Sequence, residues 1–385
     1  MEKSASISHV GLDVHRKFSR VTVRDEANAI VVRGRLEHGD RVALRRELAA
    51  WPPGTAVLLE GSFGWPWIAD ECVAAGLDPH LVNSRKLAEW RRARGQAKCN
   101  RLDADLVSEL WLQQPRWWES WLAPPEVREL RELLRHRMNR VRIQTGLKNR
   151  IHARLHRPGV LHPFSDLFGT GGRRFLQHLA GAQAGPLSPM AQRTLKSDLQ
   201  LLDHVRQQIA SATREFRRRV QAAPEAERLR TIPGINHVLA YTLWAEIGTI
   251  TRFASARELA AYSLLVPRAD ESGDERPASP GQRHVGYVGR RSLKWAFVQA
   301  AHGAVAHGGV FRARFNQLTH NGRERKAQAY VTIAHQLSGL VDVSWRKEID
   351  FQVVPPPRPG SRAARRARPV SGQPADAMVR GRPRG

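Results

Sequence analysis

The chain has 385 residues, and its 62 Lys and Arg against 36 Asp and Glu leave a formal net charge of +26. Such an excess repels itself unless a polyanion neutralises it, which favours a nucleic-acid partner. The segment after Val353 contributes only +7, so the excess is not confined to the C-terminus. Two cysteines give neither a disulfide framework nor a zinc set. No apolar run is long enough to span a bilayer and the N-terminus lacks a signal-peptide core, so we expect a cytoplasmic protein with no membrane partner.

The first 118 residues carry strand and helix patterns in the order of a ribonuclease-H-like (RuvC-like) domain. Three stretches with strand periodicity come first, and helices and strands then alternate. The expected strands are 9–15, 18–25, 29–38, 55–62 and 80–84, and the expected helices are 40–51 and about 65–75, with further helical stretches up to residue 114. We therefore expect an α/β domain with a mixed sheet flanked by helices.

The rest of the chain has an all-α pattern, apart from its tail. A Pro- and Trp-rich boundary precedes a long, basic, amphipathic helix at 126–157, which ends at Pro158 and the Gly/Pro-rich stretch up to Pro189. In the next helix, apolar residues recur near heptad spacing, so the two helices form either an antiparallel pair or a dimerising coiled-coil arm. The tail is rich in Pro, Gly and Arg, which predicts disorder. The expected domains are 1–118, 119–222, 223–351 and 352–385.

Residues 229–248 have the pattern of a helix-hairpin-helix. A short helix, a Pro-Gly-Ile turn that contains Gly234 and a second helix follow one another. In this motif the backbone N–H groups of the turn can meet a phosphate at a helix N-terminus. Gly234 is therefore a candidate nucleic-acid contact.

Four positions of the N-terminal domain are candidates for a metal site made of oxygen ligands. Asp13 lies between two apolar residues of the first expected strand, where a buried charge needs a partner or a metal. Glu60 ends a buried strand that neighbours the first one in a ribonuclease-H-like sheet. Asn100 and Asp103 are three residues apart at the start of an expected helix and so share a face. Oxygen ligands with open positions suit Mg²⁺, although each acid taken alone is more simply a turn or edge residue.

A second candidate site is a segment rich in Gly, Pro and charge at 266–295, between two expected helices. Ser272 precedes Gly273 there, with three arginines close in sequence: Arg268, Arg276 and Arg283. A serine hydroxyl is a weak nucleophile unless it is activated, and arginines stabilise the transition state of phosphoryl transfer. Since a Ser-Gly pair in a loop is ordinarily a turn, these residues alone give only a weak prediction of chemistry.

Over its whole length except the tail, the chain resembles the RuvC-like, DEDD-type insertion-sequence transposases of the IS110 family. HVGLDVHRKFSRVTV resembles the family's first-Asp strand, LLEGSFGW its Glu motif, and KCNRLDADL its Lys-x-Asp-x-x-Asp-Ala segment. The long stretch from LRTIPGINHV to PRADESG is similar to the start of the family's C-terminal transposase domain. The resemblance implies a recombinase that excises and inserts a mobile element.

The resemblance also assigns roles by position. Asp13, Glu60 and Asp103 match three of the family's four acids, and Ser272 matches its catalytic serine. The resemblance implies serine attack on a DNA phosphate, a covalent protein–DNA intermediate and Mg²⁺ bound by the acids. It further implies donor and target DNA, an element-encoded bridge RNA that pairs with both, and a homo-oligomer, either a dimer or a tetramer. The basic helices 126–157 and 190–219 are then RNA and oligomer contacts.

Asn100 stands where the resemblance places the third acid, which leaves the expected site one formal charge short. Asp105 is no substitute, because a residue two positions from Asp103 points to another face of the helix. We expect an intact fold with weaker metal binding and with reduced or lost transposition. Two alternatives stay open: a RuvC-like, metal-dependent nuclease that uses water in place of Ser272, and a catalytically dead relative that only binds nucleic acid.

Overall fold

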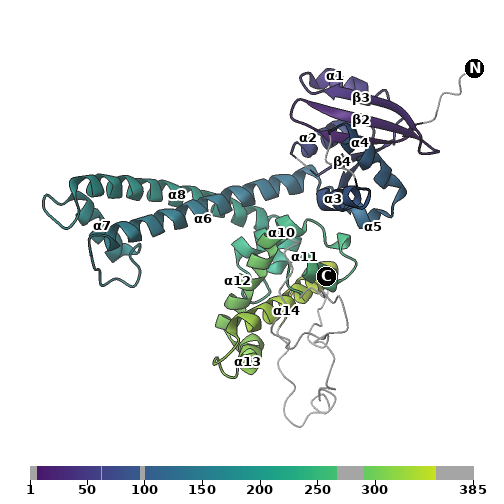
Figure 1. The fold of residues 1–385 in the computed structure, drawn as a ribbon. Coiled ribbons are helices and arrows are strands. Elements are labelled where there is room, and N and C mark those ends of the chain that lie inside the picture. The colour runs from purple at the N-terminus through teal and green to yellow at the C-terminus, as the bar shows by residue number, and fades with distance from the viewer. Residues whose placement is uncertain (1–6, 62, 96–99, 267–289, 353–385) are drawn as a thin grey trace, which may run out of the picture. The chain divides into compact units, whose positions relative to one another are not determined.

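The computed structural model describes residues 7–61, 63–95, 100–266 and 290–352. The chain divides into two compact units, Met1–Ala123 and Pro124–Gly385 (Figure 1). Among the described residues, no helix is both long enough and apolar enough to cross a membrane.

The first unit is built on a six-stranded mixed sheet. Its strands are β1 (Ile7–Val14), β2 (Phe18–Asp25), β3 (Ile30–Glu37), β4 (Ala56–Glu60), β5 (Asp78–Val82) and β6 (Glu119–Ser120). They lie in the order β3-β2-β1-β4-β5-β6. The first three strands form an antiparallel meander, β4 and β5 continue the sheet in parallel with β1, and β6 adds an antiparallel edge. The meander followed by parallel strands matches the predicted ribonuclease-H-like order, whereas β6 was not predicted.

Successive strand residues point to opposite faces of the sheet. Both faces carry apolar side chains, and helices cover both. On one face, Leu12 and Leu59 pack with α1 (Arg41–Leu48) and α2 (Trp65–Ala74). On the other face, Leu58 and Val82 pack with the second group of helices. This group comprises α3 (Ser84–Ala93), α4 (Asn100–Glu109) and α5 (Pro115–Trp118), with a 3₁₀ turn, η1 (Leu110–Leu112), between the last two.

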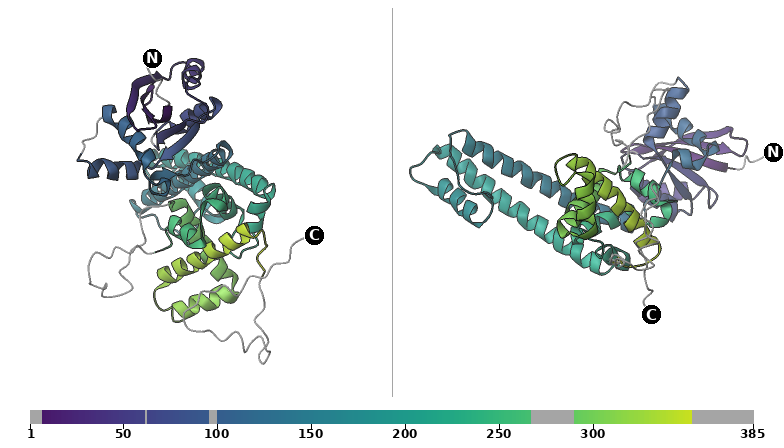
Figure 2. Two further views of the ribbon diagram at one scale, coloured as in Figure 1. Left: turned by 90° about the vertical axis from the view of Figure 1, so that its right-hand side faces the viewer. Right: turned by 90° about the horizontal axis from the view of Figure 1, so that it is seen from below.

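The second unit begins with two long helices that run antiparallel, α6 (Pro125–His156) and α8 (Pro189–Gln221), side by side in Figures 1 and 2. The direction follows from their contacts, since Arg137 bonds Thr213 whereas Arg154 bonds Thr194. The pairing predicted from heptad spacing therefore occurs within one chain. Helix α7 (Thr170–Gly181) packs at the far end of the pair, inside the Gly/Pro-rich stretch where sequence analysis predicted only an interruption.

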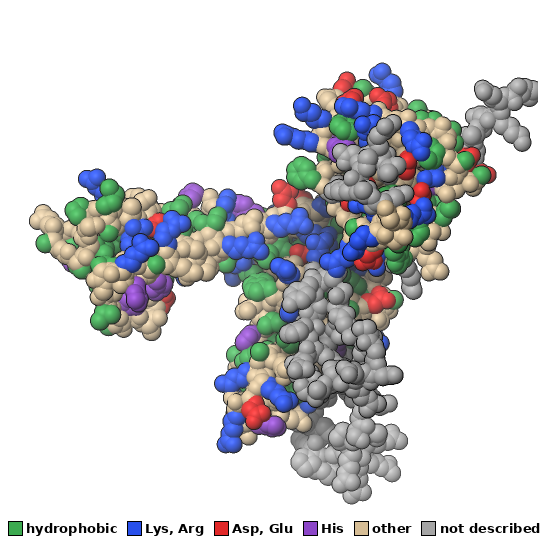
Figure 3. Space-filling view, viewed as in Figure 1, with side chains coloured by type: hydrophobic (Ala, Val, Ile, Leu, Met, Phe, Trp, Pro, Cys, Tyr) green, Lys and Arg blue, Asp and Glu red, His purple; other side chains and the backbone are tan. Residues whose placement is uncertain are grey.

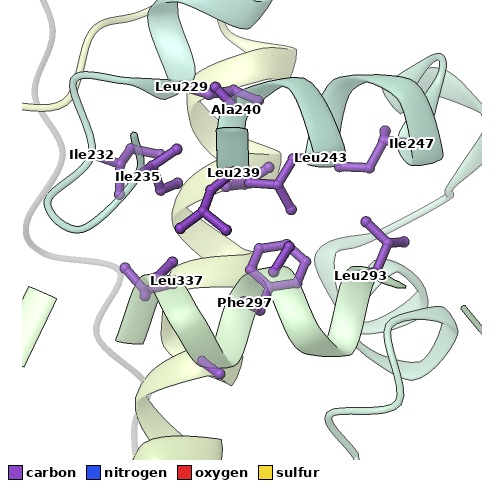
Figure 4. Packing of buried hydrophobic residues seen from close by; sticks show 14 of the residues in the cluster. Leu229, Ile232, Ile235, Leu239, Ala240, Leu243, Ile247, Leu293, Phe297 and Leu337 are labelled. Atoms are coloured by element: carbon purple, nitrogen blue, oxygen red, sulfur yellow. The ribbon is translucent and has the colours of Figure 1, made fainter. Parts of the chain in front are cut away.

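The remaining helices form an all-α region around one apolar core. They are α9 (Pro224–Leu229), α10 (His237–Ile247), α11 (Ala256–Tyr262), α12 (Arg291–His307), α13 (Gly309–Leu318) and α14 (Lys326–Arg346), with a 3₁₀ turn, η2 (Ile250–Arg252), after α10. Figure 4 shows Leu239 and Leu243 of α10 facing Phe297 of α12, with Leu337 of α14 beside them. Burial of these side chains, rather than any sheet, holds the region together.

The near ends of α6 and α8 are part of this same core. Phe216 of α8 stacks on Tyr241 of α10, with ring centroids 3.7 Å apart and ring planes 4° from parallel. The Tyr241 hydroxyl donates a hydrogen bond to the Leu130 carbonyl of α6 at 3.1 Å. The two long helices are therefore anchored in the C-terminal core at one end and extend from it at the other (Figure 1).

Candidate functional site at the carboxyl edge of the sheet

Two of the predicted acids lie side by side at the carboxyl ends of neighbouring strands. Leu12 of β1 pairs with Leu59 of β4 in parallel register, so Asp13 and Glu60 follow at the same level. Because Leu12 and Leu59 face α1 and α2, the two acids point to the opposite face, toward α4. Asp13 is 6% exposed, and one of its carboxylate oxygens lies 3.1 Å from His15 Nε2. The predicted meeting of these two strands is thus confirmed.

Gly11 allows α4 to bring a third acid to the same face. A Cβ atom at this position would lie 2.5 Å from the Ala104 carbonyl oxygen and 2.6 Å from the Ser108 backbone nitrogen. Only a residue without a side chain lets α4 approach β1 so closely. Asp103, one residue before Ala104, is buried at 3% exposure. The glycine in the HVGLDVH stretch therefore has a structural reason that sequence analysis did not give.

The electrostatics of Glu60 show that the three acids act on one another. Burial raises the pKa of Glu60, and the negative charges of Asp13 and Asp103 raise it further. A hydrogen bond with Ser84 and the positive charge of Arg91 oppose this rise. A cluster of carboxylates that disfavours its own ionisation is suited to a divalent cation, which would neutralise it.

Arg91 is a member of this cluster that sequence analysis missed. Its Nη2 donates a hydrogen bond to Asp103 Oδ1 at 2.7 Å, and both side chains are largely buried. Arg91 lies on α3, twelve residues before its partner and across the unassigned residues 96–99. No periodicity or motif in the sequence marks such a pair, because it arises from the packing of α3 beside α4.

Asp105 holds α4 to the sheet and takes no part in this cluster. Its Oδ1 accepts a 2.6 Å hydrogen bond from Thr22 of β2, and Arg33 of β3 donates to both of its oxygens. Arg24 adds hydrogen bonds to Ser108 Oγ and to the Asp105 carbonyl. The prediction that Asp105 points away from the face of Asp103 agrees with these contacts.

The residue types at this edge fit Mg²⁺, but the side chains are not arranged to coordinate a metal ion together. Carboxylate oxygens are the ligands that Mg²⁺ prefers. Among the described residues, however, no group of three or more His, Cys, Asp and Glu is placed to hold a metal ion. The Asp103 carboxylate is directed to Arg91, so a cation shared by all three acids requires this side chain to exchange partners.

Several predicted site residues lie wholly or partly outside the described residues. The backbone of Asn100 begins α4, but its side chain is not among those described. The candidate nucleophile Ser272 and the three neighbouring arginines, Arg268, Arg276 and Arg283, fall within 267–289, which the structure does not describe. Their roles stay predictions.

Gly234 has a packing role in the turn between α9 and α10. It has φ +85°, and a Cβ atom there would lie 2.1 Å from the Ala300 carbonyl oxygen of α12. The Asn236 side chain accepts hydrogen bonds from the backbone N–H groups of Val238 and Leu239, which caps α10. These contacts explain why the turn needs glycine without involving a phosphate, and the predicted phosphate contact at Gly234 stays untested.

Basic side chains spread along the pair α6 and α8. Between Leu133 and His156 the chain contains no Asp or Glu. Figure 3 shows Lys and Arg side chains over the visible face of the pair. Exposed basic residues on the two helices include Arg135, Arg142, Arg150, Arg193, Lys196, Arg214 and Arg217. Such a surface is suited to the phosphate backbone of a nucleic acid.

The family model of the DEDD-type transposases, described as "Transposase", matches residues 10–158, a range that contains the carboxylate edge. The chain is therefore a transposase of the DEDD type. A second model, described as "Transposase IS116/IS110/IS902 family", matches residues 226–316. The two matches cover both units and together more than half of the chain. The protein belongs to the IS110 family of insertion-sequence transposases.

Curated relatives carry the same description. The chain is 28% identical over 153 residues to the "Transposase for insertion sequence element IS1111A" of Coxiella burnetii, a match that covers 39% of this chain and 40% of that protein. It is 25% identical over 308 residues to a "Probable family 20 transposase" of Pseudomonas aeruginosa, covering 78% of this chain and 84% of the relative. A transposase for element IS1328 of Yersinia enterocolitica is 23% identical over 269 residues, covering 70% and 76%.

Proposed function

We propose that this protein cuts and rejoins DNA at the ends of its insertion sequence, with Ser272 as nucleophile and with Mg²⁺ held by Asp13, Glu60 and Asp103. The observation that carries the metal part is the convergence of three carboxylates on one face of the sheet, where the charges of Asp13 and Asp103 disfavour the ionisation of Glu60. Asn100 begins the helix that carries Asp103 and would add a neutral oxygen ligand. Membership of a DEDD-type transposase family supports both parts.

The serine step is a transesterification. The Ser272 Oγ forms a bond to phosphorus while the bond from phosphorus to one deoxyribose oxygen breaks. The serine gives up its proton, and the released deoxyribose hydroxyl gains one. The three arginines close to Ser272 in sequence would offset the charge that develops on the phosphoryl oxygens. Rejoining is the reverse step with a different DNA end, so no bond energy is lost between the two.

In this proposal a guide RNA determines which DNA sequences the protein acts on. In this proposal an RNA encoded by the element pairs with donor and target DNA, and the protein holds the nucleic acids through their backbones. The exposed basic residues along α6 and α8 support this assignment, since a surface with an excess of positive charge attracts phosphate irrespective of sequence. The same pair of helices is the proposed contact between subunits of a dimer or tetramer.

The test is a search for a covalent protein–DNA adduct. Purified protein, Mg²⁺, RNA transcribed from the flanking DNA and labelled donor DNA are mixed and resolved on a denaturing gel. We expect an adduct from the wild type and from Ser279→Ala, a matched serine in the same segment, and none from Ser272→Ala. Asp13→Asn should also lose it.

Other outcomes separate the alternatives. Cleavage that persists in Ser272→Ala without an adduct would establish the metal-dependent nuclease instead. An adduct formed by Asn100→Asp but not by the wild type would show that this copy is impaired at its metal site. Binding without cleavage in both proteins, with any divalent metal, would leave only a nucleic-acid-binding role.

A further inference from the structure

Phe63 is an aromatic side chain that the fold leaves in solvent. It is 88% exposed, whereas the next most exposed Phe, Trp or Tyr among the described residues, Trp295, is 41% exposed. Burial of a phenyl ring stabilises a folded chain, and this ring forgoes that gain. Phe63 therefore contributes little to packing, and the face of its ring is accessible to a ligand.

The turn that carries Phe63 follows β4 at the edge of the sheet that holds the acids. It begins directly after Glu60, and the backbone N–H of Gly61 donates to the Val82 carbonyl at 3.0 Å. It ends at Gly64, which has φ +95° and precedes α2. Because both ends of this turn are fixed, little backbone entropy is lost when the ring of Phe63 binds a ligand.

The turn after β1, residues 15–17, lies beside the turn after β4. A Cβ atom at Gly64 would lie 3.7 Å from Val14 Cγ1, so the end of β1 contacts the start of α2. The side chains of Arg16 and Lys17 are exposed, and within the described part of the chain neither forms an ion pair with a carboxylate. Two basic side chains therefore share this edge of the sheet with the exposed ring.

A DNA strand is the ligand that fits the acids, the basic turn and the exposed ring together. Carboxylates can hold a phosphate through a divalent cation, whereas basic side chains attract phosphates directly. A phenyl ring stacks on the face of any base, and proteins that bind single strands combine such rings with basic side chains. Rejoining to a different DNA end requires the cut strand to leave its complement, which exposes the faces of its bases.

We propose that Phe63 stacks on an unpaired base of the DNA strand at the carboxylate edge, with Arg16 and Lys17 against neighbouring phosphates. The inference rests on the proposed function, since it takes a DNA strand at this edge as the substrate. It adds a group that holds a base next to the acids. Stacking tolerates every base, so this contact positions the strand and leaves the choice of sequence to other groups.

The test measures binding of the full-length chain to labelled DNA from the element end, in which one strand extends beyond the duplex as unpaired nucleotides. Fluorescence anisotropy is recorded in EDTA, and every protein carries Ser272→Ala, so that no cutting contributes. We expect Phe63→Ala to weaken binding about tenfold, as the loss of one stacked base would. Val73→Ala, at an exposed apolar position in the last turn of α2, is the control and should change affinity less than about threefold.

Two further variants of Phe63 separate stacking from a general apolar contact. Phe63→Trp keeps an aromatic face and should retain most of the affinity. Phe63→Leu keeps an apolar side chain without that face and should lose nearly as much affinity as Phe63→Ala. None of the three variants should lower the melting temperature, since the native ring is 88% exposed.

The basic side chains have a different signature in salt. Lys17→Gln should lower the slope of log K against log salt by about 0.7, the value for one phosphate contact with a single strand. Phe63→Ala should leave this slope unchanged, because a stacked ring releases no counterion. Arg46→Gln removes an equal charge from the exposed surface of α1 and, as the control for Lys17→Gln, should also leave the slope unchanged.

An abasic scan then locates the stacked base. Each unpaired nucleotide in turn is replaced by one that lacks its base. We expect one position at which this loss weakens binding by the parent protein, which carries only Ser272→Ala, but not by Phe63→Ala. Such a result shows that the ring and that base contribute to binding through each other.

The binding measurements can overturn the inference without reference to catalysis. Equal losses from Phe63→Ala and Val73→Ala, full affinity in Phe63→Leu, or an abasic effect that is identical in both proteins at every position would contradict it. Weakened binding to the guide RNA with unchanged binding to DNA would contradict it as well. A missing covalent adduct in the native protein would instead count against serine chemistry and leave the stacking contact standing.

Discussion

Arg91 Nη2 lies 2.7 Å from Asp103 Oδ1, so a carboxylate that we propose as a metal ligand is bound here by a guanidinium group. The positive charge of Arg91 also opposes the raised pKa of Glu60. A divalent cation bound at this edge would therefore compete with Arg91, because either positive charge neutralises the carboxylate charge that attracts the other.

The first prediction follows from this competition. Arg91→Gln should tighten Mg²⁺ or Mn²⁺ binding by about fivefold or more, since one unit charge at ~4 Å is worth ~1 kcal/mol even in water. Isothermal titration calorimetry of the full chain measures the change. Arg92→Gln, on the exposed side of the same helix, is the control and should leave the affinity unchanged. Weaker metal binding in Arg91→Gln would mean that Arg91 orders the site rather than competing for it.

The amide at position 100 gives a second prediction. Asn100→Asp should raise the affinity for Mg²⁺ or the yield of covalent adduct, because a carboxylate attracts a divalent ion more strongly than a neutral oxygen. Asn139→Asp makes the same change of charge on the exposed face of α6 and should leave the affinity for Mg²⁺ unchanged. If Asn100→Asp alters neither the affinity nor the yield, the side chain is not a ligand.

A third prediction concerns pH. Burial and the neighbouring acids raise the pKa of Glu60, so its ionisation costs folding free energy. Below the ordinary pKa of glutamate, Glu60 is protonated in both the folded and the unfolded protein, and the wild type loses no stability through it. As the pH rises through the higher pKa that Glu60 has in the folded protein, the free energy of unfolding falls. Glu60→Gln should therefore stabilise the protein at pH 7 in EDTA, and the gain should vanish near pH 4.

Denaturant unfolding at the two pH values measures this difference. Glu47→Gln, an exposed carboxylate of α1, serves as control and should change stability by less than about 0.5 kcal/mol at either pH. An equal effect of Glu60→Gln at pH 4 and pH 7 would show that its origin is packing and not charge. Added Mg²⁺ should reverse the advantage of the variant at pH 7.

The fourth prediction tests the packing of α4 against β1 at Gly11. Gly11→Ala should destabilise the first unit by about 3 kcal/mol or more, because a Cβ at 2.5 Å from the Ala104 carbonyl forces the helix away from β1. Gly34→Ala in β3 meets no atom within 4 Å and should be tolerated. Thermal unfolding of both variants gives the comparison. If Gly11→Ala folds normally, metal binding should still fall, because Asp103 has moved with α4.

The fifth prediction separates packing from phosphate binding at Gly234. Since this residue has φ +85° and touches the backbone of α12, Gly234→Ala should cost about 2 kcal/mol or more in the absence of DNA. Gly339→Ala, on α14 with no neighbour within 4 Å, is the control. A variant that is fully stable but binds DNA poorly would favour the phosphate role predicted from the hairpin pattern.

The sheet could be predicted because alternation and turn residues mark each strand locally, and the order of elements then leaves few topologies. The positions of Asp13 and Glu60 followed from that order. Helix α7 was missed because its first turn contains two glycines. Its stability comes from burial of Leu176 and Leu179 against α6 and α8, a tertiary effect that no local propensity reports.

The partners of charged side chains could not be predicted either, because they too depend on tertiary packing. Arg91 is one of three arginines in four residues, and nothing in the sequence says which of them turns inward. Likewise Arg131 lies in a basic helix whose pattern suggests a solvent-exposed role, yet it is 5% exposed and pairs with Glu246, 115 residues away. Which charge is buried is decided by packing between elements, not by periodicity within one.

The anchoring of α6 and α8 has a mechanical consequence. At 1.5 Å per residue the 32 residues of α6 extend for about 48 Å, and its root shares a core with the Phe216–Tyr241 stack. A long rigid rod fixed at one end is a lever. A small displacement at the root therefore becomes a large sweep at the tip. Conversely, a load applied at the tip is transmitted as torque to α10, which contacts both helices and packs in turn on α12, the helix that follows the segment of Ser272.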